Sequence, residues 1–203
     1  MERLCQSTLA FAEDVTHRTG KSIWCDQTPW NLIIAARIAN IYPSAVFVLM
    51  LRHYSGTILS LRRSYESGYR WAGATPEESA KLWARFYENV PKLPAERLIP
   101  VSYDLLCAKP EFVLGQLREA LREHLQIDTG SLSLDVFLKS QASTTTRNTL
   151  AIADPNGAVQ LRSISSVDRR QWTEEIEKIC SPHVAVIDQA LRLRFKGVYV
   201  APV

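Results

Sequence analysis

The chain has 203 residues, of which 46% are hydrophobic and 22% charged, and its formal net charge is +3. This length suits one globular domain with a sizeable core over residues 1–203, and the weak positive charge suits an anionic small molecule rather than nucleic acid. No apolar run approaches the roughly 20 residues that a membrane-spanning helix needs, so we expect a cytoplasmic protein without a membrane span.

Segments with strand and helix patterns alternate along the chain. The run SIWC at 22–25 predicts a short strand, and apolar residues at helical spacing over 30–42 predict a helix that starts after Pro29. The continuous apolar run over 45–51 predicts a strand that is buried on both faces. Further segments predict helices at 57–66, 76–90, 110–125 and 170–193 (interrupted at 181–182), a strand at 97–103 and a long loop at 140–170.

This alternation predicts an α/β fold with three layers, in which a mostly parallel sheet is flanked by helices on both faces. Ligands of such sheets bind beyond the carboxyl ends of the strands. Arg52 stands at the carboxyl end of the most apolar strand, and Ser60 follows on the next helix. A guanidinium and a hydroxyl in this place suit a phosphate, although a solvated surface arginine remains an equal alternative.

The cysteines and histidines give no sign of a metal site. Four cysteines lie far apart in the chain, and four histidines show no metal-ligand spacing. We therefore expect free thiols in a reducing compartment and no metal.

Several segments in order resemble the 3′-phosphoadenosine-5′-phosphosulfate (PAPS)-dependent sulfotransferases, closest to their bacterial and carbohydrate- or tyrosylprotein-type branch. The matching segments are WCDQTPWN at 24–31, LMLRHYSGTILSL at 49–61 and PVSYDLL at 100–106. In that family a strand ends in an arginine with a serine eight positions later, as Arg52 and Ser60 are spaced here. The resemblance implies that this pair holds the 3′-phosphate of PAPS. It also implies a P-loop NTPase-like sulfotransferase fold.

Two weaker matches imply further cofactor-binding residues. Tyr103 lies in a segment similar to the family motif V-x-Y-E-D-L. Ser166, Arg169 and Arg170 precede a tryptophan, as in the family loop S-x-V-G-R-W that closes over the nucleotide, but the glycine of that loop is missing here. The implied reaction is transfer of a sulfuryl group from PAPS to the hydroxyl or amine of an unidentified acceptor.

Two departures from the family weaken the enzyme interpretation. Residues 1–21 contain no phosphosulfate-binding loop of the type P-R-S-G-T-T, so we expect the first strand–helix unit to be missing and cannot name a catalytic acid or base. Gln27 stands where many members have a lysine that neutralises charge on the transferred group. A catalytically degenerate nucleotide-binding or scaffold domain of the same fold is therefore the alternative.

Two smaller expectations follow from the same departures. A kinase-like P-loop enzyme is disfavoured, because the chain shows neither a Walker loop nor a metal-binding aspartate after a strand. A sheet that lacks one strand would have exposed edges, so self-association is expected.

Overall fold

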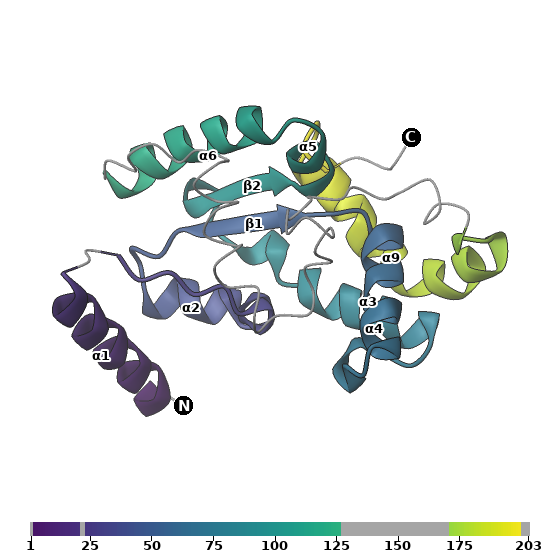
Figure 1. Cartoon of the computed structure of the whole chain (residues 1–203), viewed down its shortest axis with the longest axis horizontal. Helices are drawn as coiled ribbons and strands as arrows, with labels where there is room; N and C mark the ends of the chain where they lie inside the picture. The colour runs from purple at the N-terminus through teal and green to yellow at the C-terminus, as the bar shows by residue number, and fades with distance from the viewer. Residues whose placement is uncertain (1, 21–22, 127–170, 200–203) are drawn as a thin grey trace, which may run out of the picture.

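The structure is a computed structural model that describes residues 2–20, 23–126 and 171–199, with only the backbone for residues 2–9 (Figure 1). Helices and two strands alternate along the described chain. The helices are α1 (Glu2–Thr19), α2 (Ala35–Ile41), α3 (Tyr54–Glu66), α4 (Pro76–Tyr87), α5 (Tyr103–Ala108), α6 (Pro110–Leu125) and α9 (Glu174–Arg194). The strands are β1 (Phe47–Leu51) and β2 (Leu98–Ser102), and short 3-10 turns cover Pro29–Leu32, Arg70–Ala72, Val90–Lys92 and Ala95–Arg97.

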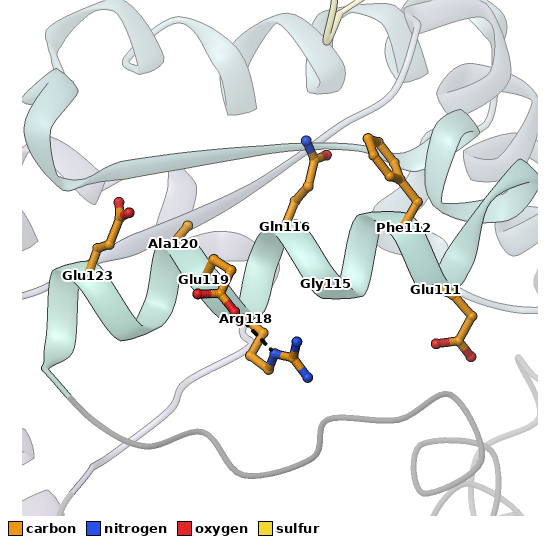
Figure 2. A pocket seen from close by; sticks show the side chains of 8 residues that line it. All are labelled: Glu111, Phe112, Gly115, Gln116, Arg118, Glu119, Ala120 and Glu123. Atoms are coloured by element: carbon orange, nitrogen blue, oxygen red, sulfur yellow. Dashed lines mark ion pairs between the residues drawn. The ribbon is translucent and has the colours of Figure 1, made fainter.

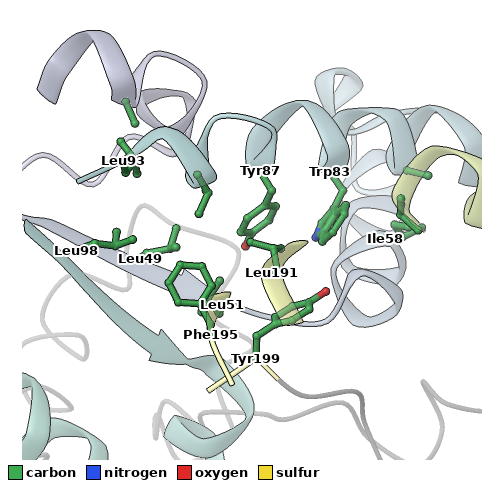
Figure 3. Packing of buried hydrophobic residues seen from close by; sticks show 14 of the residues in the cluster. Leu49, Leu51, Ile58, Trp83, Tyr87, Leu93, Leu98, Leu191, Phe195 and Tyr199 are labelled. Atoms are coloured by element: carbon green, nitrogen blue, oxygen red, sulfur yellow. The ribbon is translucent and has the colours of Figure 1, made fainter. Parts of the chain in front are cut away.

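The two strands pair in parallel, with Leu51 opposite Ser102 at their carboxyl ends. Helices lie on both sides of this pair, with α6 on the β2 side and α2 on the β1 side in Figure 1. Side chains alternate between the faces of a strand, so β1 sends Leu49 and Leu51 into the main core, which also contains residues of α2, α3, α4 and α9 (Figure 3). The mixture of helices with a small parallel sheet confirms the coarse α/β prediction.

The predicted strand at 22–25 is wrong where the structure describes it. Residues 23–25 form no strand, and the side chains of Ile23 and Trp24 are 38% and 43% exposed. The Trp24 ring instead packs edge-on against Phe11 of α1, with ring centroids 5.8 Å apart. A strand is stable only beside another strand that pairs with its backbone N–H and C=O groups. The described sheet consists of β1 and β2, and residues 23–25 do not pair with either strand.

The prediction that the 45–51 strand is buried on both faces is also wrong. Val48 is 46% exposed and Met50 is 40% exposed, on the face of β1 opposite to the main core. On that face α6 packs against the β2 residues Ile99 and Val101 through Val113. Among the described elements, α6 therefore covers the β2 half of this face, whereas Val48 and Met50 in the β1 half stay exposed.

Local hydrogen bonds move the start of one helix and the end of one strand from their predicted places. Helix α3 begins at Tyr54 rather than at 57, with His53 as its N-cap residue: the His53 Nδ1 lies 2.8 Å from Oγ and 3.3 Å from the backbone N of Ser55. The strand predicted to reach 103 ends at Ser102, whose hydroxyl accepts a hydrogen bond of 3.2 Å from the Leu105 N–H and so starts α5.

The remaining helices agree with the predictions to different degrees. The helix predicted at 30–42 is a 3-10 turn followed by α2, and the helix predicted at 76–90 ends at Tyr87. Helix α6 has the predicted bounds, whereas α1 and α5 were not predicted. Helix α9 was expected to break at 181–182 but continues through Pro182. Proline removes one helix hydrogen bond, but Cys180 and Val184 on either side are 0% and 1% exposed in the main core, and this packing keeps the helix continuous.

Candidate functional site

Two of the residues predicted to bind the cofactor meet at the carboxyl end of the sheet. Arg52 directly follows β1 and Tyr103 directly follows β2, one position beyond the paired Leu51 and Ser102. The Arg52 guanidinium carbon lies 4.5 Å from the centre of the Tyr103 ring, a cation–π contact. The parallel register thus brings together two residues that are 51 positions apart in the chain.

The Arg52 guanidinium has an unused donor. Its Nε is buried and has no hydrogen-bond partner in the described part of the chain. Buried N–H groups are nearly always paired, because an unpaired one loses its bonds to water without replacement. A guanidinium held this way at the end of a parallel strand is suited to bind an anion that brings its own acceptor oxygens.

The neighbours of Arg52 leave its positive charge available. Burial raises the pKa of the Tyr103 hydroxyl, and burial likewise raises the pKa of the Cys107 thiol. Both groups are therefore neutral at pH 7. Asp104 is close enough to affect both pKa values, yet no described ion pair joins it to Arg52.

Two other residues of the predicted site, Ser60 and Gln27, lie on the surface of the described structure. Ser60 is exposed on α3, about 9 Å along the helix axis from Tyr54. Gln27 is exposed in the coil that leads to Pro29. The late-loop residues Ser166, Arg169 and Arg170 lie outside the described residues.

A buried polar network beside Arg52 was not predicted. His53, the next residue, is 6% exposed, and its Nε2 lies 3.1 Å from Nη2 of Arg192 on α9. Burial lowers the pKa of His53 to about 4, against a smaller opposing effect of the Asp188 carboxylate. Arg192 lies 139 positions from His53, so no local pattern in the sequence could indicate this contact.

Two surface hollows lie elsewhere. One of about 590 Å³ follows α6; its described lining comes from that helix and includes Glu111, Glu119 and Glu123 with one arginine, Arg118 (Figure 2). Three carboxylates beside one guanidinium disfavour a phosphate. The other, of about 440 Å³, lies before the amino ends of the strands. Neither is lined by Arg52 or Tyr103, so the chemistry of Arg52 marks the better anion site.

Comparison with known proteins assigns the chain to a family. Residues 3–126 match the Sulfotransferase family. The chain belongs to the sulfotransferase family. No curated protein and no solved structure matches it. The matched region of this sulfotransferase includes Gln27, Arg52, Ser60 and Tyr103, whereas α9 lies outside it.

Two further features bear on the chemistry of this sulfotransferase. Within the described ranges, no group of three or more His, Cys, Asp or Glu could hold a metal ion. None of the helices described there is long and apolar enough to cross a bilayer. Membership of the family indicates a transferase of sulfuryl groups.

Proposed function

We propose that this sulfotransferase uses PAPS as its donor and binds the 3′-phosphate of the nucleotide at Arg52. The observation that carries the proposal is the buried Nε of Arg52, which has no partner in the described part of the chain. A phosphate oxygen would supply that partner. The acceptor is a hydroxyl or amine compound, as the family resemblance implies.

The surroundings of Arg52 suit a phosphate in three ways. A guanidinium can donate two parallel hydrogen bonds to two oxygens of one phosphate. Helix α3 starts two residues after Arg52, so its first backbone N–H groups and the positive end of its dipole lie nearby. The exposed hydroxyl of Ser60 is a further donor, and Tyr103 forms one wall of the site.

The remaining roles belong to the same proposal. Ser166, Arg169 and Arg170 would contact the nucleotide from the late loop. Gln27 would face the transferred sulfuryl group as a hydrogen-bond donor without a charge. Sulfuryl transfer, like phosphoryl transfer, depends mainly on positioning and on electrostatic stabilisation of an in-line displacement, so the neutral amide predicts slow turnover.

A thermal-shift titration tests the nucleotide site. Adenosine 3′,5′-bisphosphate at 100 times its dissociation constant should stabilise the wild type by about 2.7 kcal/mol, and 5′-ADP, which lacks the 3′-phosphate, should stabilise it much less. Arg52→Ala should remove the difference between the two nucleotides. Arg63→Ala, which deletes an exposed guanidinium of α3, is the matched control and should behave like the wild type.

The outcomes separate three conclusions. Equal shifts with both nucleotides, or an unchanged preference in Arg52→Ala, would contradict the assignment of the 3′-phosphate to Arg52. A specific shift followed by release of adenosine 3′,5′-bisphosphate from PAPS in the presence of acceptor mixtures supports the enzyme. A specific shift without such release supports the second candidate, a degenerate nucleotide-binding domain, which the neutral Gln27 favours.

A further inference from the structure

The turn that carries Arg52 is held by the last described helix of the chain. His53 and Tyr54 follow Arg52, and both contact α9 or the residues just after it. The His53 ring contacts the ring of Tyr54, at 4.1 Å between centroids, and stacks with that of Tyr199, at 6.1 Å. The Tyr54 hydroxyl donates to Glu177 of α9 at 2.8 Å.

Arg192 is the residue of α9 that reaches the His53 ring. Its Nε donates to Oδ2 of Asp188 at 2.6 Å, and its Nη2 lies 3.1 Å from Nε2 of His53. Oδ1 of Asp188 accepts a hydrogen bond of 2.7 Å from the Tyr199 hydroxyl. The Arg192 guanidinium is therefore held by the Asp188 carboxylate on one side and contacts the His53 imidazole on the other.

This contact selects one form of the histidine. A guanidinium has donors and no acceptor, so Nε2 of His53 must present its lone pair to Arg192. The ring proton then sits on Nδ1, where Ser55 Oγ accepts it at 2.8 Å. The opposite tautomer would let Nδ1 accept a hydrogen bond from the Ser55 N–H, 3.3 Å away, but it would direct Nε2–H at Asp188, whose Oδ1 is 3.8 Å away, and against the donors of Arg192. The contact of Nε2 with the charged guanidinium is the shorter one, at 3.1 Å, and favours the first form.

We propose that Arg192, outside the region that matches the family, is a positioning residue of the anion site: it orients the His53 ring and thereby the turn that holds Arg52. Arg192 is connected to the anion site through direct contacts, because His53 is bonded covalently to Arg52 and its ring contacts Ser55 in the first turn of α3. Both the guanidinium and the helix start depend on this turn. The role in nucleotide binding rests on the proposed function, whereas the orientation of the ring does not.

Nitrogen NMR of the imidazole tests the orientation without any nucleotide. With ¹⁵N-histidine label, and with His53→Gln to assign the signals, the wild type should show the Nδ1–H tautomer at neutral pH. Arg192→Met should move His53 toward the Nε2–H form, because Asp188 becomes the partner of Nε2. Arg192→Lys keeps a donor and should retain the original form. Unchanged His53 signals in Arg192→Met would overturn the proposal.

Nucleotide titration tests the consequence for the site. Arg192→Met should weaken binding of adenosine 3′,5′-bisphosphate about tenfold, and Arg192→Lys less. Arg194→Met is the matched control: Arg194, also half-buried on α9, donates to the carbonyls of Pro91 and Leu93, both at 2.6 Å, away from His53.

Failure of this inference differs from failure of the proposed function. Equal affinity in the wild type and Arg192→Met, or the same loss in Arg194→Met as in Arg192→Met, would overturn the positioning role. Absence of binding by the wild type would instead overturn the nucleotide site, and with it the part of the inference that rests on that site. The tautomer experiment would then still decide whether Arg192 orients the ring.

Discussion

At the scale of single residues, His53 is kept neutral by its surroundings. Its imidazole is buried, and burial is the main reason why its pKa falls to about 4. The charged groups that face it come from α9: Arg192 lowers this pKa further, while Asp188 and Glu177 oppose the change. A neutral ring can accept a hydrogen bond from Arg192, whereas a charged ring could not.

We predict that His53 makes the folded protein less stable in acid. In the unfolded chain this histidine binds a proton below its ordinary pKa of 6.5, but in the folded protein it stays neutral down to about pH 4. The unfolded state therefore binds more protons in this window, and the free energy of unfolding decreases as the pH falls through it, by about 3 kcal/mol in total. Urea unfolding curves between pH 7 and about pH 4 measure the decrease.

The variant His53→Gln is the control for this pH dependence. Glutamine cannot titrate, so its unfolding free energy should fall less between pH 6.5 and 5, even if the variant is less stable at pH 7. The interval is informative because few carboxylates titrate there. Parallel curves for the wild type and His53→Gln would show that His53 does not cause the acid sensitivity.

At the scale of elements, the approach to α4 depends on close backbone packing. Gly73 has a φ of +90°, and a Cβ built on it would lie 2.8 Å from the backbone N of Ser79 and 2.9 Å from its Oγ. Thr75 caps α4 by accepting a hydrogen bond of 3.1 Å from the Glu78 N–H, as expected from the sequence. The buried Ser79 hydroxyl donates to the Ala72 carbonyl at 3.0 Å. The turn is therefore fixed both by its conformation and by its contacts.

We predict that Gly73→Ala destabilises the protein by about 2 kcal/mol or more, since it combines an unfavourable φ with a clash against backbone. Gly115→Ala is the matched control in the interior of α6, where an added Cβ meets no atom within 4 Å. Gly115→Ala should leave the free energy of unfolding unchanged or raise it by up to about 1 kcal/mol, because alanine has a higher helix propensity than glycine. Chemical denaturation of both variants compares them; a Gly73→Ala protein as stable as the wild type would contradict the steric argument.

At the scale of the whole molecule, the described sheet has only two strands, and part of one face is uncovered. Val48 and Met50 are exposed beside the covered residues Ile99 and Val101. A strand with an open edge and an apolar face is a template for pairing with another chain. Antiparallel pairing of two β1 strands about a two-fold axis at Leu49 would place each Val48 opposite the partner's Met50.

We predict that the protein self-associates through β1. Met50→Lys places a charge on the open apolar face and should shift the protein toward the monomer, whose mass is 22.9 kDa. Val186→Lys, at an 82% exposed position of α9, adds the same charge elsewhere and should leave association unchanged. Sedimentation velocity over a wide concentration range measures both. A wild type that sediments as a monomer throughout would refute this prediction.

The local sequence pattern was sufficient to predict elements whose structure depends mainly on residues near one another in the chain. The apolar run before Arg52 and the amphipathic segment 110–125 predicted β1 and α6, and Thr75 predicted the start of α4. Local pattern failed at 22–25, where the strand needed a partner, and at Pro182, where packing against the core outweighs one lost hydrogen bond. In both cases a distant contact decides the structure.

The sequence by itself determined the family, the alternation of strands and helices, and Arg52 as the candidate anion-binding residue, because each is carried by order and spacing along the chain. Tertiary structure alone decided three contacts among the described residues: Arg52 meets Tyr103 and its Nε has no partner there, Val48 and Met50 of β1 stay exposed, and α9 reaches His53 through Arg192. Such contacts join residues far apart in the chain, and they form only when burial of the core brings their elements together.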